Sequence, residues 1–212
     1  MDAEQTWHVI QQQRLAIADL LDGLTPAQWE SPSLCAGWRI RDVAAHLTTV
    51  SMPPSPGSLL VDLIRARGGF HRLNTLATRR RAGRPTARIV ADLRAHAASR
   101  KVPVVSNHRN VLFDLLVHGQ DIAVPLGLDL PMPLEAATDG ASRVWSMGWP
   151  FWARRRLRGV RLTATDMEWS VGSGAEIRGP IRALLLLLTG RTSTAAPLLS
   201  GEGVTRLAGS AT

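Results

Sequence analysis

Cysteine is nearly absent from this sequence, and so are long apolar runs. Cys35 is the one cysteine among 212 residues, which excludes an internal disulfide and a cysteine-rich metal site. The longest apolar run, from Ala183 to Leu188, is far too short to cross a bilayer. The first residues have neither the basic nor the apolar region of a signal peptide. We therefore expect a cytoplasmic protein with no membrane partner.

Lysine is also scarce, and tyrosine is absent. Lys101 is the only lysine, so arginine supplies nearly all the positive charge of a chain with a net charge of +8. The arginines cluster at 79–81 and 154–156. A basic chain can bind nucleic acid, but no nucleic-acid motif and no array of stacking aromatic residues accompanies these clusters. We interpret them as solvated surface and expect no nucleic-acid partner.

The first 130 residues have the apolar spacing of helices and little strand pattern. Apolar residues recur near a period of 3.6 over 4–22, from Gly37 to about Val50, over 86–99 and over 107–125. Prolines after Val50 end the second helix and begin a long connection, 52–85. Four principal helices with one long connection predict a four-helix bundle.

After residue 130 the pattern changes. A helix is predicted over 134–152, followed by three short strands at 159–165, 168–171 and 175–178. Gly179 and Pro180 then introduce another helix. The fold class is therefore α+β, with a four-helix bundle domain over 1–130 and a small C-terminal α+β domain over 131–212.

Most of the candidate metal-binding side chains lie on the helix predicted over 107–125. Asp114 and His118 are four residues apart, which places them one turn apart on one helix face, and Asp121 extends the same stripe. A carboxylate and an imidazole on an apolar face are costly to bury without a partner. A divalent metal suits both groups, and His46, on the inward face of the second helix, is the candidate third ligand.

Other interpretations of these residues remain open. His118 could simply pack with a neighbouring carboxylate, and His46 could be a core histidine with satisfied hydrogen bonds. Asp121 could orient a metal ligand from behind, cap a turn or pair with an arginine. Cys35 could be a redox or metal-proximal thiol, although a buried small apolar side chain is the commoner role. Asn107 and Arg109, near the start of the same helix, could meet a substrate anion, although surface positions are the commoner role.

Three long motifs resemble those of the mycothiol-dependent maleylpyruvate isomerase family. The first is LTPAQWESPSLCAGWRIRDVAAHL at 24–47, and the second is FDLLVHGQDIAVPLG at 113–127. The third joins LTATDMEWSVGSGAEIRGPIRALLLLLTGR at 162–191 to LSGEGVTRL at 199–207. The resemblance spans nearly the whole chain, and 52–85 is its least typical part.

The resemblance implies a DinB-like bundle that holds a divalent metal, usually zinc, through two histidines and a carboxylate. Carried over, these ligands are His46, Asp114 and His118. Asp114 stands where the isomerase has glutamate, and Arg39 stands where a residue such as threonine is common. Arg178 and Arg191 are the candidates for the family's substrate-binding arginine.

The sequence therefore leads to a principal hypothesis and two alternatives. The principal hypothesis is a metal-dependent enzyme that uses a small thiol, mycothiol by preference, to isomerise or conjugate a small electrophile. The alternatives are a non-catalytic metal-binding bundle with a structural or sensing role and, from charge alone, a nucleic-acid-binding protein. The sequence leaves a homodimer open.

Overall fold

A computed structural model describes residues 1–51, 78, 81–102 and 106–210. Its helices and strands are α1 (Ala3–Asp22), α2 (Pro26–Glu30), α3 (Ile40–Ser51), α6 (Thr86–Ala95), α7 (His108–Ala123), α8 (Leu134–Ser146), α9 (Ala153–Arg156), β1 (Val160–Ala164), β2 (Ser170–Gly172), β3 (Ala175–Gly179), α10 (Ile181–Leu188) and α11 (Thr192–Ala195). Short 3-10 helices occupy Val124–Leu126, Ala196–Leu198 and Glu202–Ser210. Most of the predicted connection over 52–85 lies outside the described residues.

Contacts divide the described chain into two compact units. One comprises Asp2–Val111 with His118–Leu130, and the other comprises Pro131–Thr212 with Met1 and the stretch Leu112–Val117 of α7. The predicted α+β class, with a helical bundle and a small C-terminal α+β part, is confirmed. The division into domains 1–130 and 131–212 stays a prediction, because part of α7 groups with the C-terminal unit.

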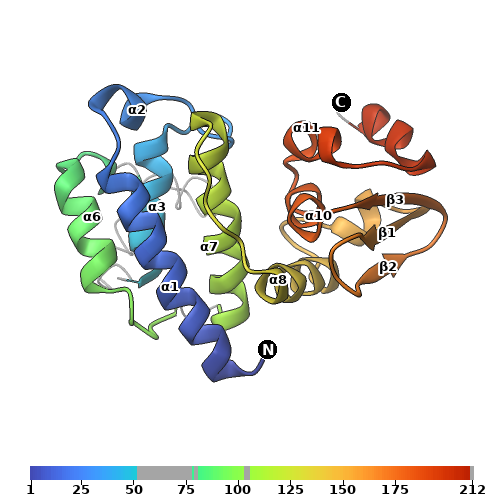
Figure 1. Cartoon of the computed structure of the whole chain (residues 1–212), viewed down its shortest axis with the longest axis horizontal. Coiled ribbons are helices and arrows are strands. Elements are labelled where there is room, and N and C mark those ends of the chain that lie inside the picture. Colours follow the sequence, from blue (N-terminus) through green and yellow to red (C-terminus); the bar gives the residue numbers. More distant parts are fainter. Residues whose placement is uncertain (52–77, 79–80, 103–105, 211–212) are drawn as a thin grey trace, which may run out of the picture. The chain divides into compact units, whose positions relative to one another are not determined.

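The bundle unit is built from α1, α3, α6 and α7 (Figure 1). The helices begin with local caps: Asp2 and Gln5 form a capping box on α1, and the Asn107 side chain accepts a hydrogen bond from the Asn110 N–H of α7. Their apolar stripes meet in a core that contains Ile10, Ile17, Leu21, Ile40, Leu47, Ile89, Leu93 and Ile122, all at most 2% exposed.

The C-terminal unit contains a three-stranded sheet in the order β2-β1-β3. β1 pairs antiparallel with β2, with Leu162 opposite Val171, and parallel with β3, with Leu162 opposite Ile177. Helices α8 and α10 pack on one another, and every residue of 183–188 is buried. The apolar run is thus core. None of the helices in the described part of the chain combines the length and apolarity needed to cross a membrane.

Two predicted helices are too long. The helix predicted over 134–152 ends at Ser146, since Gly148 and Pro150 are poor helix residues. The helix predicted over 86–99 ends at Ala95. Beyond it the chain turns, and Arg14 of α1 donates from Nη1 to the carbonyls of Ala97, at 3.0 Å, and Ser99, at 2.7 Å. These carbonyls therefore bind a guanidinium instead of continuing a helical ladder.

We expect Arg14→Met to destabilise the bundle. Arg14 is 1% exposed, and burial lowers its pKa to about 10, so it remains charged at neutral pH. Methionine fills a similar volume but leaves buried carbonyls without a donor, so the free energy of unfolding should fall by about 2 kcal/mol or more. Urea unfolding followed by circular dichroism measures this. Arg100→Met, at an exposed pair with Glu4, is the control; an equal loss in both variants would contradict the prediction.

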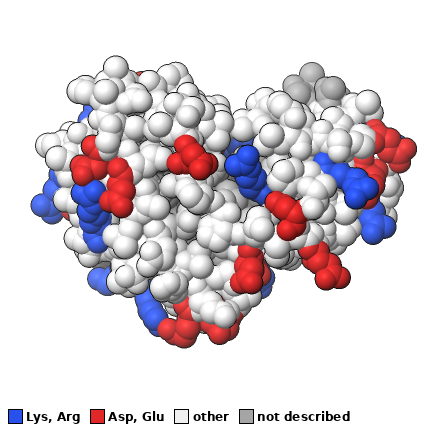
Figure 2. Space-filling view, in the orientation of Figure 1, with Lys and Arg blue, Asp and Glu red and all other residues white. Residues whose placement is uncertain are grey.

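Acidic and basic side chains lie beside one another on the face drawn in Figure 2. The ion pairs of the described residues include Arg94 with Asp19 and Asp22, and Arg100 with Glu4. The net charge of the chain is therefore not gathered into one basic surface on that face.

Candidate metal centre

Helices α3 and α7 bring the three predicted metal ligands together. His46 lies on α3, and Asp114 and His118 lie on α7; one ligand atom from each residue lies within 4.8 Å of those of the other two. His46 is buried, and Asp114 and His118 are half-buried. Two imidazoles and a carboxylate form a donor set that suits zinc and leaves a coordination position open. Their use as metal ligands stays a prediction.

The two imidazole rings of this cluster and the neighbouring indole of Trp38 are packed edge to face. The ring centroids of His46 and His118 lie 4.9 Å apart with their planes at 78°. The ring of Trp38 meets that of His46 at 5.6 Å and 67°. These contacts restrict rotation of both imidazoles, so the nitrogen atoms are held in place before any ligand arrives.

Asp121 supports His118 from behind. Asp121 is fully buried, and its Oδ2 lies 2.7 Å from Nδ1 of His118. With the carboxylate ionised, this hydrogen bond requires the proton on Nδ1, which leaves the Nε2 lone pair of His118 available. The sequence left three roles open for Asp121: orienting a metal ligand, capping a turn or pairing with an arginine. In the structure, Asp121 is bonded to His118, the candidate ligand.

Cys35 differs from the expectation of a buried apolar side chain. It is half-buried, and its Sγ donates to Asp121 Oδ2 at 3.0 Å and lies 3.6 Å from His118 Nδ1. The turn that carries it is tied to α7, because the Leu34 N–H donates to the Asp121 carbonyl. Gly37, at a φ of 75°, allows the chain to reverse there. Cys35 thus lies beside a candidate metal ligand, and its role as a metal-proximal or redox thiol stays a prediction.

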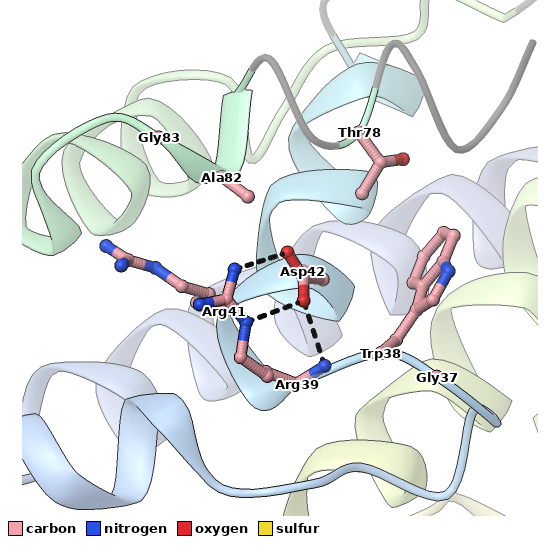
Figure 3. Close-up of a pocket in the computed structure, with 8 residues that line it drawn as sticks. All are labelled: Gly37, Trp38, Arg39, Arg41, Asp42, Thr78, Ala82 and Gly83. Carbon is pink, nitrogen blue, oxygen red and sulfur yellow. Dashed lines mark hydrogen bonds and ion pairs between the residues drawn. The ribbon is translucent and has the colours of Figure 1, made fainter.

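A pocket of about 460 Å³ opens at the start of α3 (Figure 3). Its lining residues are Gly37, Trp38, Arg39, Arg41, Asp42, Thr78, Ala82 and Gly83. Within it, Arg39 donates from its backbone and its guanidinium to Asp42. Burial of Asp42 raises its pKa, but the hydrogen bonds from Arg39 outweigh this effect and leave the pKa below its usual value.

No pattern in the sequence indicates this pocket. In the sequence, Trp38 and Arg39 stand out only as parts of the motif at 24–47. Thr78 lies in 52–85, the stretch that is least typical of the family. The remaining candidates have local partners. Arg178 lies 3.9 Å from Glu176, and Arg191 donates to the Thr189 carbonyl, so each has a neighbour within the C-terminal unit. Arg109 is exposed, as expected.

Comparison with known proteins gives a family match and two similar folds. Residues 10–104 match the model of the mycothiol maleylpyruvate isomerase N-terminal domain. A crystal structure of the mycothiol-dependent maleylpyruvate isomerase is 12% identical with a TM-score of 0.63. A crystal structure of a histidine-to-alanine mutant of that enzyme is 11% identical with a TM-score of 0.62. Both similarities cover 95% of this chain and 93% of the other. At these identities the likeness is one of fold. No curated protein matches the chain.

Proposed function

This chain belongs to the mycothiol maleylpyruvate isomerase family, and from that premise we propose that it is a metal-dependent enzyme acting with a small thiol. The thiol is mycothiol by preference, and the reaction is the isomerisation or conjugation of a small electrophile in the cytoplasm. The observation that carries the proposal is the approach of His46, Asp114 and His118 within one ion's reach.

The donor set fits a divalent ion, and zinc is the preferred one. His46, Asp114 and His118 would hold it, with one position left for the substrate thiol. A bound divalent ion would lower the pKa of that thiol and favour the thiolate, which is the nucleophilic form.

Residues around the candidate ligands fix the orientation of the two histidine rings. With its carboxylate ionised, Asp121 accepts a hydrogen bond from Nδ1 of His118, so that Nε2 carries the lone pair. Trp38 packs against His46 and restricts its ring. Asp114 is one methylene shorter than the glutamate of the isomerase motif, so we propose a similar chemistry without assigning maleylpyruvate as the substrate.

The proposal predicts a thiol-dependent activity that requires metal. Elemental analysis of untagged protein should find about one divalent metal ion per chain, with zinc as the expected metal. With mycothiol and a panel of small electrophiles, it should accelerate electrophile consumption. Activity should disappear after chelation and return with added zinc. Glutathione serves as the matched control thiol.

Two results would contradict the proposal in different ways. Thiol consumption that is unchanged by chelation would exclude the metal's role. A tightly bound metal with no turnover of any thiol would instead favour the non-catalytic bundle, with a structural or sensing function.

A further inference from the structure

Cys35, His118 and Asp121 form a second cluster of metal-ligating atoms beside the candidate metal centre. Sγ of Cys35 lies 3.6 Å from Nδ1 of His118 and 3.0 Å from Oδ2 of Asp121, and Nδ1 lies 2.7 Å from Oδ2. These atoms come from two elements, the turn before α3 and helix α7. His118 belongs to both clusters, but it offers Nδ1 to this one and Nε2 to the other, because Asp121 engages Nδ1.

The size of this triangle suits a zinc-class ion. Three atoms at these distances lie about 1.8 Å from their common centre, which is less than the zinc bond lengths of about 2.0 to 2.3 Å. An ion slightly above the plane of the triangle therefore reaches all three atoms and keeps a fourth position open. A thiolate sulfur among the ligands favours soft cations such as zinc over magnesium or calcium.

The three atoms are held in place, and a cation can approach two of them from solvent. The Cys35 N–H donates to Ser33 Oγ at 3.1 Å, and the Leu34 N–H donates to the Asp121 carbonyl, so the turn is fixed on α7. Asp121 is fully buried, but Cys35 is half-buried and the His118 side chain is 15% exposed.

Two protons occupy the place that an ion would take. The Sγ–H of Cys35 and the Nδ1–H of His118 both donate to Oδ2 of the ionised Asp121. A divalent cation that binds all three atoms releases these two protons to solvent, so the net charge of the cluster is unchanged. Because the cation must displace both protons, we expect it to bind more weakly than the first ion and to be lost on dialysis.

We propose that Cys35, His118 and Asp121 form a second cation site, which takes a thiophilic divalent ion and shares the His118 ring with the first site. When both sites are filled, the ring bridges the two ions through Nδ1 and Nε2. The second site does not depend on the thiol-dependent activity proposed above, because neither His46 nor Asp114 contributes to it.

The test is a titration of the full chain, preloaded with one zinc ion per chain, with cadmium chloride in thiol-free buffer. Cys35 is the sole cysteine, so the ultraviolet charge-transfer band of a cadmium–thiolate bond reports on this residue alone. The band should saturate at one cadmium ion per chain and be absent from Cys35→Ser. Asp121→Asn should weaken cadmium binding by about tenfold or more, whereas Asp129→Asn, at an exposed position, should titrate like the wild type.

Two histidine variants separate the second site from the first. His46→Ala breaks the first set only, so the cadmium band should remain, whereas His118→Ala should weaken cadmium binding about tenfold or more. A band that is lost in His46→Ala would make Cys35 a ligand of the first ion and overturn the proposal. Absence of a band in the wild type would also overturn it. Equal cadmium affinity in the wild type, His118→Ala and Asp121→Asn would show cadmium on a lone thiolate, with the same consequence.

Discussion

Replacing His118 with alanine is expected to remove the bound metal. His118 shares helix α7 with Asp114 and faces His46 across the bundle, and its Nε2 is the nitrogen that Asp121 leaves available. Two remaining ligands cannot hold a divalent ion as three do, so the content should fall from about one ion per chain to nearly none. Elemental analysis after dialysis measures the result, with His46→Ala as a second variant that should behave alike.

His108→Ala is the matched control for this experiment. It lies on the same helix and contacts Trp7, outside the three-residue cluster. Its metal content should equal that of the wild type. An unchanged content in His118→Ala, or an equal loss in His108→Ala, would show that the metal, if present, is held elsewhere or depends only on the integrity of α7.

The second large effect is expected at Asp121. Asparagine keeps the size of Asp121 but removes the charge that fixes the proton on Nδ1 of His118. Loss of such a supporting partner typically costs about 10- to 100-fold in metal affinity. Competition with a chromophoric chelator measures the dissociation constant of zinc. The variant should still bind zinc measurably, because all three candidate ligands remain.

Two further variants distinguish support of His118 from a general effect of charge. Asp129→Asn removes a carboxylate from an exposed position and should leave the affinity unchanged. Cys35→Ser keeps a donor to Asp121 and should have a much smaller effect than Asp121→Asn. If Asp121→Asn matches Asp129→Asn, Asp121 has no role in orienting the metal ligand.

Local sequence was sufficient for the helices that carry the cluster. Asp114, His118 and Asp121 share a helix, so their relative positions follow from the 3.6-residue period, and α7 differs from its predicted range by two residues at most. The three strands were likewise predicted from alternation and their glycine-containing connections. These features depend on interactions between residues a few positions apart.

The ends of two helices could not be predicted in this way. The predicted segment over 86–99 has a continuous apolar stripe, yet α6 ends at Ala95 because Arg14, on a different helix, binds the carbonyls that follow. An apolar stripe records which residues are buried, but it carries no information about a donor supplied from another part of the chain.

The sequence by itself therefore determined the α+β class, the course of α7 and the candidate donors His46, Asp114 and His118. Only the tertiary structure decided that Cys35 lies beside Asp121 and His118, and that Thr78, Arg41 and Trp38 line one pocket. The physical reason is distance along the chain. A helix period relates neighbours within a few turns, whereas contacts across a bundle depend on how buried faces pack, and no short-range pattern encodes that.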